Sequence, residues 1–563
     1  MVQPAFAATG PAVVGLTLIN ADTNQPIAAF NPLRDGATIN LATLSTRRLN
    51  VRANTNPSTV GSVRFGLDNT SNFRTENSKA YALLGNSGAD YNPWTPKMGA
   101  HTIYATAYTG ANGRGTAGAR LKVGFTVVDQ IPAGPPIANN PYRPNSPHNS
   151  GLSEPFRGSG AKPTGRVLNI RNFGATSNNS TNDDAQALRR AIAAAVKGDV
   201  VYMPDGVYHF KTINVNMKAG VSLRGQSRAR TVVSTVFAPY SANYYSGQVI
   251  GAVGGNGDLS ISNFSIRRSG GKAAQYGVLV SDSSRVTVSD LLVEGWKITG
   301  IGVIKGSKHT IVRNNIVRNG TSTASGEGYG IVVSDLNSKG ASANNNWITG
   351  NTITGKGRNA TTGVRHAIIV SYRAHHNLIA NNRMTNITLE ALDFHAHDEY
   401  SNEARYNVIR GCRLAGIALG NPGWRWPNDA NGYYYDSGPN NWVHHNDVSG
   451  CGVGIVVEFL SHRQYIEDNY LHANTYGIRF YNGGARNIRI LRNRVQNNQH
   501  MGVGVTGGAG LVMIGNVVTG NGSDPLVTDS ATVNFTITGN DFRSNDGTVR
   551  LGSTDGVFAN NRK

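Results

Sequence analysis

The sequence predicts an all-β protein in which a β-sandwich precedes a long parallel β-solenoid. Three observations support this fold class. Glycine is abundant, at 68 of 563 residues, while hydrophobic residues make up only 39%, a composition that favours short strands and turns over long helices. The first 130 residues contain several short alternating strands, and the second half contains a six-residue motif that recurs. The chain is also too long for one ordinary core.

Residues 1–130 are predicted to form the sandwich. Six segments between Gly, Asn, Pro and Asp turns have strand character: VVGLTLI, ATINLA, RLNVRAN, SVRFGLD, HTIYATAYT and LKVGFTVVD. Short alternating strands at this spacing are typical of two packed sheets. The segment from VRFGLD to DYNPW (63–94) resembles immunoglobulin-like accessory modules of bacterial secreted enzymes. This resemblance implies either carbohydrate binding through exposed aromatic residues such as Tyr91 and Trp94, or a spacer.

Residues 131–163 contain eight prolines and no periodic apolar pattern, which predicts a partly extended linker. Residues 164–563 form the predicted catalytic domain. It begins with one amphipathic helix in DDAQALRRAIAAAVKGD, with Asp183 or Asp184 near its start and Gly198 after its end. The order FGAT, NDDAQALRRAIAAA, GDVVYMPDGVY resembles the entry segment of pectate-lyase-like right-handed parallel β-helix proteins, in which a helix caps the first coil.

A repeated motif, apolar-x-x-Asn-x-apolar, supports the solenoid independently. It occurs as IVRNNI, ITGNTI, IANNRM, IRGCRL, VHHNDV, IEDNYL, ILRNRV, MIGNVV and ITGNDF, and its fourth position falls at Asn314, Asn351, Asn382, Cys412, Asn446, Asn469, Asn493, Asn516 and Asn540. Stacked coils explain such a period, with turn asparagines bonding from coil to coil. Consecutive fourth positions of the motif are 37, 31, 30 and 34 residues apart, and then 23 or 24 residues apart. Four enlarged coils therefore carry loops that wall a groove.

The stretch EALDFHAHDEY (390–400) lies within these coils. Eight of the 14 histidines lie inside these coils or beside them. We interpret His375, His376, His444 and His445 as turn residues. Aligned strands GIGVI, GIVVS, AIIVS, ALDFH, GIALG, GIVVE and GIRFY send their third and fifth residues outward. Asp393 and His395 then face out, with Glu458 two coils beyond and roughly 10 Å from His395. His366, after Arg365, and Glu390 occupy equivalent positions in adjacent coils.

These positions define the candidate site. The loop NPGWRWPNDANGYYYD (421–436) adds aromatic rings that stack on sugars and an arginine that can pair with a carboxylate. We predict catalytic roles for His366, Asp393, His395, Arg365 and Tyr400. We predict substrate-binding roles for Glu390, His397, Trp424, Arg425, Tyr434 and Glu458. The alternative is that DFHAHD is a polar loop without a function.

The chain carries a formal charge of +20, which attracts polyanions. No nucleic-acid-binding signature accompanies this charge, so we expect an acidic polysaccharide as partner and no nucleic acid. The β-helix resemblance implies polysaccharide lyases, polygalacturonases or mannuronan C5-epimerases. The GHG and RIK of polygalacturonases and the WIDH of pectate lyases are missing, while Asp393-Phe394-His395 resembles the DPH of the epimerases.

Lyases and C5-epimerases share one first step, the removal of the proton at C5 of a uronic acid, which needs a base and a group that neutralises the carboxylate. His395 or His366 is the expected base. The expected neutralising group is Arg365 or Arg425, or alternatively Ca²⁺ held by Asp393, Asp398 and Glu390. The expected proton donor is Tyr400 or one of Tyr433, Tyr434 and Tyr435. Hydrolysis by two carboxylates from Asp393, Asp398 and Glu458 is the other chemistry.

The sequence thus predicts a secreted, monomeric polysaccharide lyase that acts by β-elimination. C5 epimerisation and hydrolysis are the alternative reactions, and a non-catalytic glycan-binding adhesin is the alternative function. No run of about 18 apolar residues is present, so we expect no membrane span. AFAA near the start fits the end of a signal peptide. Cys412 and Cys451 either pair or stay free.

Overall fold

The structure is a computed structural model. It describes residues 10–41, 44, 46–128, 165–237, 247–321, 328–334, 342–357, 359–395, 399–420, 438–458, 460–481 and 483–563. The chain separates into two compact units, Met1–Pro132 and Ala133–Lys563. The predicted linker at 131–163 lies outside the described residues. In the part of the chain that is described, no helix combines the length and apolar character needed to cross a membrane.

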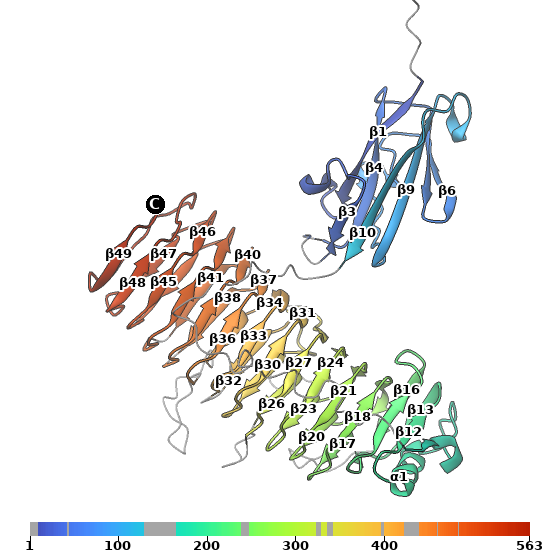
Figure 1. Cartoon of the computed structure of the whole chain (residues 1–563), viewed down its shortest axis with the longest axis vertical. Coiled ribbons are helices and arrows are strands. Elements are labelled where there is room, and N and C mark those ends of the chain that lie inside the picture. Colours follow the sequence, from blue (N-terminus) through green and yellow to red (C-terminus); the bar gives the residue numbers. More distant parts are fainter. Residues whose placement is uncertain are drawn as a thin grey trace, which may run out of the picture. The chain divides into compact units, whose positions relative to one another are not determined.

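The first unit is a sandwich of two sheets, as predicted (Figure 1). One sheet has the order β2-β1-β4 and the other β3-β10-β9-β5-β6. Their bounds are β1 (Ala12–Asn20), β2 (Gln25–Pro26), β3 (Ala37–Asn40), β4 (Leu49–Asn56), β5 (Ser62–Leu67), β6 (Thr70–Glu76), β9 (Gly99–Tyr108) and β10 (Leu121–Val128), beside a small hairpin of β7 (Asn86–Ser87) and β8 (Asp90–Tyr91). The apolar side chains that alternate along these strands meet in one core.

One prediction for the sandwich is wrong. Tyr91 is not an exposed aromatic residue, because only 8% of it is accessible and it packs against Ile19 and Ala82. Trp94 is partly buried and packs against the sandwich core and the edge of the His101 ring. The strand β6 was not predicted, because its sequence TSNFRTE is polar and mostly exposed and has no alternating apolar face.

The second unit is a parallel β-helix in which each coil adds one strand to each of three sheets (Figure 1). Solenoid sheet 1 runs from β11 (Val167–Asn169) to β49 (Gly556–Ala559), and solenoid sheet 2 from β13 (Gly206–Phe210) to β46 (Val517–Thr519). Solenoid sheet 3 comprises β14 (Val215–Asn216), β17 (Gln248–Val253), β20 (Tyr276–Ser281), β23 (Thr299–Ile304), β26 (Tyr329–Ser334), β29 (His366–Ser371), β32 (Leu392–His395), β35 (Ala415–Leu419), β38 (Val453–Glu458), β41 (Tyr476–Tyr481), β44 (Val503–Val505) and β47 (Leu526–Thr528). Inward residues of all three sheets form one continuous core.

A single helix, α1 (Asp184–Ala194), covers the first coil, as predicted. Asp183 caps it by accepting a hydrogen bond from the backbone N–H of Ala185. The apolar face of the helix, which includes Leu188 and Ile192, joins the solenoid core. Figure 1 places α1 at the end of the coil stack, beside β12 (Val200–Met203) and β13.

The asparagine ladder is present, with two corrections. Each ladder side chain donates from Nδ2 to Oδ1 of the asparagine one coil further on, as in Asn382 to Asn407 and Asn407 to Asn446, both 3.0 Å or shorter. Asn407, and not Cys412, therefore occupies the ladder in this coil. The ladder also begins at Asn315, whereas Asn314 has a left-handed φ of 55°. In these turns the residue with the left-handed backbone directly precedes the ladder residue, as Asn381 precedes Asn382.

Two further ladders lie at the other corners of the coil. One links Asn346, Asn377, Asn402 and Asn441, and the other links Asn474, Asn498, Asn521 and Asn545. Buried amide groups are normally paired in this way because an unmade hydrogen bond is costly. The three corners are thus fixed by side-chain bonds in addition to the sheets.

The corrected ladder changes the coil lengths. Consecutive ladder residues are 36, 31, 25 and 39 residues apart from Asn315 to Asn446, and then 23 or 24. Three coils are therefore strongly enlarged instead of four. The coil that contains His395 is not one of them. It had been counted as enlarged because Cys412, which lies one corner after Asn407, was taken as its ladder position. The long loops belong to its neighbours.

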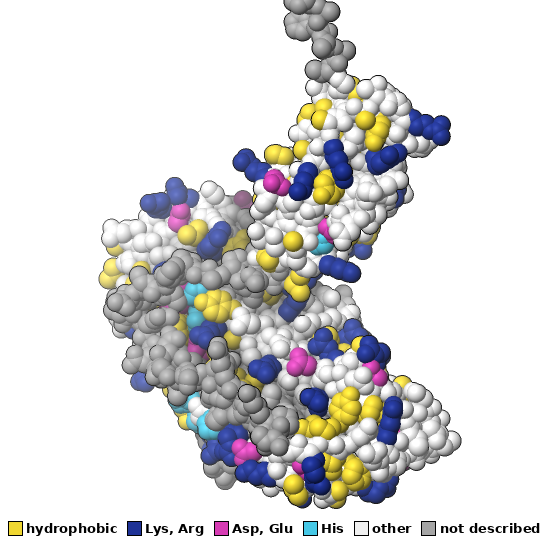
Figure 2. Space-filling view, turned by 45° about the vertical axis from the view of Figure 1, so that its right-hand side comes forward, with side chains coloured by type: hydrophobic (Ala, Val, Ile, Leu, Met, Phe, Trp, Pro, Cys, Tyr) yellow, Lys and Arg dark blue, Asp and Glu magenta, His cyan; other side chains and the backbone are white. Residues whose placement is uncertain are grey.

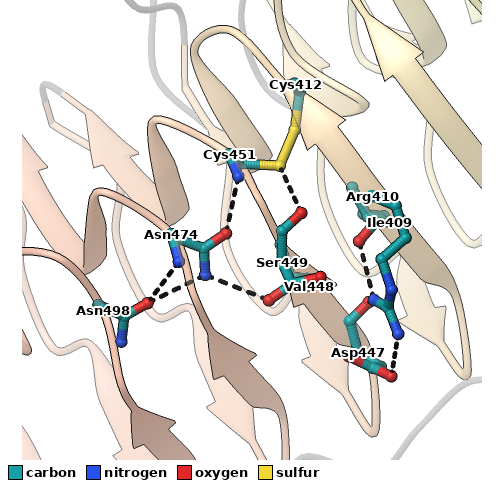
Figure 3. Close-up of a disulfide and its surroundings, with 9 residues drawn as sticks. All are labelled: Ile409, Arg410, Cys412, Asp447, Val448, Ser449, Cys451, Asn474 and Asn498. Carbon is teal, nitrogen blue, oxygen red and sulfur yellow. Dashed lines mark hydrogen bonds and ion pairs between the residues drawn. A yellow bond between two sulfur atoms is a disulfide. The ribbon is translucent and has the colours of Figure 1, made fainter. Parts of the chain in front are cut away.

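Cys412 and Cys451 form a disulfide between adjacent coils (Figure 3). Cys412 is the last residue of β34 (Val408–Cys412) and Cys451 follows β37 (Asp447–Ser449), and both strands belong to solenoid sheet 2. Figure 3 shows that the bond lies at the end of a ladder, because Asn474 accepts from the backbone N–H of Cys451 and donates to Asn498. On the same strands, Arg410 pairs with Asp447.

Candidate active site

The candidate site lies on the outer face of solenoid sheet 3, on the neighbouring strands β29 and β32. Ile369 pairs with Asp393 and Ser371 with His395. Leu392 and Phe394 point inward and are fully buried in the solenoid core. Since side chains alternate along a strand, Asp393 and His395 take the outer face, as the sequence alignment of the coils predicts.

Asp393 is the centre of a compact group of four ionisable side chains. Its Oδ2 lies 3.0 Å from Nδ1 of His395 and 3.1 Å from Nδ1 of His366. The same nitrogen of His366 lies 3.2 Å from Oε2 of Glu390. The structure thus brings together four of the predicted residues, and His366 and Glu390, which the sequence places at equivalent positions of adjacent coils, are in contact.

The group is buried except at one end. Asp393, Glu390 and His366 have side-chain exposures of 0%, 2% and 8%, whereas His395 keeps 28%. The outward row that holds Asp393 is apolar in the preceding coils, where it carries Val332 and Ile369. Because Nδ1 of His395 is bonded to Asp393, its Nε2 is the nitrogen free to meet a substrate.

Burial and mutual contact shift the pKa values of this group. Burial raises the pKa of Glu390 to about 6. Burial alone would also raise the pKa of Asp393, but the charges and hydrogen bonds of His395 and His366 outweigh it and lower that pKa to about 2. Burial would lower the pKa of His395, yet the nearby carboxylates, Asp393 above all, raise it. His395 is therefore a stronger base than a free histidine.

The remaining predicted residues fall into three groups. Arg365, directly before β29, is half-buried, and its charge acts on His395 by lowering the pKa of that ring. Tyr400 stacks on His375 at 4.5 Å and meets the edge of His376, so it belongs to a second histidine pair at the next corner of the coil. The predicted residues outside the described part of the chain are His397, Asp398, Trp424, Arg425, Tyr433, Tyr434 and Tyr435.

Glu458 differs from its prediction. Leu419 pairs with both Phe394 and Val457. The next residues along the three strands, His395, Gly420 and Glu458, therefore lie in one row. However, only 2% of Glu458 is accessible. It is therefore not an open partner that faces His395 across a sugar ring, as the alternation of the strand suggested.

The predicted calcium ligands are only partly described, because Asp398 lies outside the described residues. One ligand atom each from His366, Glu390 and Asp393 lies within 4.8 Å of the others. Calcium prefers six to eight oxygen ligands, whereas this set contains an imidazole nitrogen and two carboxylates, of which Asp393 is already bonded to His395. We therefore assign no step of the reaction to calcium.

The sequence analysis missed a further set on the same face. Arg479 on β41 lies between the rings of Tyr476 and Tyr481, with its guanidinium carbon 4.4 Å and 4.5 Å from their centroids. Arg479 continues the row of Asp393, three coils further along. The signal was available, because Arg479 and Tyr481 are the third and fifth residues of GIRFY.

Two family models match the solenoid. One, described as "Right handed beta helix region", matches residues 210–371 and 424–542. The other, described as "Rhamnogalacturonase A/epimerase, pectate lyase-like", matches residues 167–251. The chain belongs to the pectate-lyase-like right-handed β-helix superfamily. The first match covers the strand with His366, and the second covers the capping helix and first coils on which the predicted resemblance rests. Among curated proteins, none matches this sequence.

Several solved structures resemble the chain at low identity. The A-module of mannuronan C-5 epimerase AlgE6 from Azotobacter vinelandii is 14% identical, with a TM-score of 0.43 over 70% of this chain and 98% of that one. PfbA, a surface adhesin of Streptococcus pneumoniae, is 15% identical, with a TM-score of 0.44 over 68% of this chain and 91% of that one. A family 28 exopolygalacturonase from Yersinia enterocolitica is 12% identical, with a TM-score of 0.41 over 93% of this chain and 100% of that one. At this identity we draw no function from them.

Proposed function

We propose that the β-helix cleaves a uronic-acid-containing polysaccharide by β-elimination, with His395 as the base. One observation carries the proposal. His395 is the exposed end of a group whose other members are buried, and the buried Asp393 both orients its ring and raises its pKa. An imidazole that is oriented by a buried carboxylate through one nitrogen and open at the other is a recurrent arrangement for proton transfer.

The proposed reaction needs few groups. Nε2 of His395 takes the proton at C5 of the uronate, whose electron pair forms the C4–C5 double bond while the C4–O bond breaks. Arg365 neutralises the sugar carboxylate as charge develops there. The leaving oxygen then takes its proton from the imidazolium of His395, which Asp393 stabilises. Because Tyr400 packs against His375 and His376, we no longer assign it the role of proton donor.

Other chemistries fit the described residues less well. Hydrolysis requires two carboxyl groups that flank the bond, but Asp393 and Glu458 are buried. C5 epimerisation shares the first step and differs only in the return of the proton to C5. A non-catalytic adhesin needs no buried carboxylate behind an exposed histidine.

The test is a time course of wild-type protein with alginate, pectate, glucuronan, chondroitin and hyaluronan. We expect the ultraviolet absorbance of a 4,5-unsaturated uronate to rise on at least one of these polymers. New reducing ends without that absorbance would mean hydrolysis. Deuterium uptake at C5 from heavy water without either signal would mean epimerisation. Polymer binding with none of the three signals would favour the adhesin.

We also propose that the protein is secreted. The disulfide between Cys412 and Cys451 supports this, since such bonds persist mainly in oxidising compartments outside the cytosol. An acidic polysaccharide is also an extracellular substrate. Fractionation of the native host with an antibody against this chain tests the proposal, and a protein found only in the cytosol would contradict it.

A further inference from the structure

A second polar pocket lies beside solenoid sheet 3, separate from the candidate active site. It has a volume of about 330 Å³ and is lined by Arg268, Gly271, Lys272, Ala273, Gln275, Lys297 and Thr321. This volume is at the lower end of the range for small-molecule sites, so it suits one charged substituent or sugar unit. No acidic side chain is among these lining residues.

None of the acidic residues that the structure describes neutralises the positive charge of the pocket. Among the described residues, Arg268, Lys272 and Lys297 form no ion pair with an acid. The nearby Glu294 is taken by Arg318 at 2.7 Å and by Arg267 at 3.4 Å. Three cations that share a pocket repel one another, and an anion in the pocket would relieve this repulsion.

Two features give the pocket a built geometry. Arg268 donates from Nε and Nη2 to the backbone oxygen of Gly271, which fixes its guanidinium at the rim. Gln275 is 2% exposed, and its Oε1 is buried without a hydrogen-bond partner. Buried carboxamides are normally paired, and this one can turn its NH₂ group toward an acceptor. The unpaired atom is an acceptor, so Gln275 can bind a carboxylate only through its NH₂ group after this turn.

The position of the pocket relates it to the active site. Lys272 and Gln275 precede β20, Lys297 precedes β23, and Thr321 lies in the corresponding turn before β26. The same turn carries Arg365 before β29 and Glu390 before β32. With coils ~4.8 Å apart, Lys297 is roughly 14 Å from the coil of His395 along one edge of the sheet.

We infer that this cationic pocket binds the carboxylate of a second uronate residue on the same polysaccharide chain as the residue that reacts. The inference rests on the proposed function and deepens it. The carboxylate meets Lys272, Lys297 and Arg268, and Gln275 donates to one of its oxygens. The pocket thereby selects polymers that carry a charge on more than one sugar, and it holds the chain along solenoid sheet 3.

The experiment compares polymer affinity in full-length variants that all carry His395→Ala, so that substrate is not consumed. The parent, a pocket variant with Lys272→Gln and Lys297→Gln, and a control with Lys197→Gln and Lys308→Gln are titrated with the same five polymers. The control removes the same charge from exposed lysines elsewhere on the solenoid. Neutral dextran, sulfated chondroitin and single-stranded DNA complete the panel.

We expect the pocket variant to bind the preferred uronate polymer about tenfold more weakly than the parent, which corresponds to about 1.4 kcal/mol, while the control keeps its affinity. Equal weakening of both variants would overturn the inference and leave the proposed function standing. If the parent binds no uronate polymer, the proposed substrate class and the inference both fail. Loss confined to sulfated chondroitin or to DNA would overturn the uronate assignment.

Discussion

At the scale of single residues, the proposed base, His395, is partly exposed and is supported from within the protein. His395 alone reaches solvent, while Asp393, His366 and Glu390 behind it are buried and in contact. A buried ionised carboxylate is costly unless it is paired, and Asp393 is paired with two imidazoles. We conclude that the group is arranged for the basicity and orientation of His395.

The pH dependence of the reaction follows from this pairing. His395 must be neutral to accept a proton, and its pKa is raised above the ordinary 6.5. The rate should therefore rise with pH, with an acid limb in kcat/KM above pH 6.5. In Asp393→Asn the limb should move to lower pH, because the negative charge that raises the pKa is gone. An acid limb that does not move in that variant would contradict the pairing of His395 with Asp393.

Metal dependence tests a second property of the same residues. Since we assign the neutralising role to Arg365 and not to calcium, turnover of the preferred polymer should be unchanged after dialysis against a chelator. The ultraviolet assay with and without EDTA measures this, with added Mg²⁺ as a control for ionic strength. Loss of turnover that only calcium restores would assign calcium the neutralising role that we give to Arg365.

The sequence predicts which residues of the candidate site face outward, but it does not predict which of them are buried or what they contact. The alternation of ALDFH predicts the outward Asp393 and inward Phe394, because each coil repeats one register. Burial of Asp393 and Glu458 was not predictable in this way, since it depends on what packs against the outer face. Tyr400, only five residues from His395 in the sequence, packs at the next corner of the coil against His375 and His376.

At the scale of elements, the corners of the coils carry specific buried contacts. Asn407 donates to the backbone oxygen of Ile379 at 2.9 Å and to Asn446, and it accepts from Asn382. Asn407→Ala should therefore leave buried polar groups unpaired and reduce the free energy of unfolding by about 1–3 kcal/mol. Denaturant unfolding measures this. The half-exposed Asn561 at the ladder end is the control, and an equal effect at both positions would contradict the ladder.

The disulfide stabilises the corner where Cys412 and Cys451 meet. It closes a loop with a sequence separation of 39 residues, and constraint of such a loop in the unfolded chain is worth about 2–4 kcal/mol. Replacement of both cysteines by alanine should lower the melting temperature in a calorimeter. The wild-type protein under reducing conditions should melt like the variant. If neither change affects melting, the bond contributes nothing to stability.

At the scale of the whole molecule, we propose that the positive charge of the protein selects the polymers that approach it. The chain has 53 basic and 33 acidic residues, and Figure 2 shows basic side chains distributed over the visible face of both units. Binding of a uronate polymer should weaken at least tenfold between low and 0.5 M salt, because added ions screen these charges. A titration series in NaCl measures this. An affinity independent of salt would indicate that the positive field has no part in binding.

The most direct test of the account is the rate of elimination by His395→Ala on the preferred polymer, compared with wild-type protein and with His209→Ala as a histidine control on solenoid sheet 2. General base catalysis contributes about 10²–10⁴-fold. We predict a loss of that size in His395→Ala, with unchanged polymer affinity and melting temperature, and no loss in His209→Ala. Unchanged turnover in folded His395→Ala would show that the base lies elsewhere and would contradict the central claim.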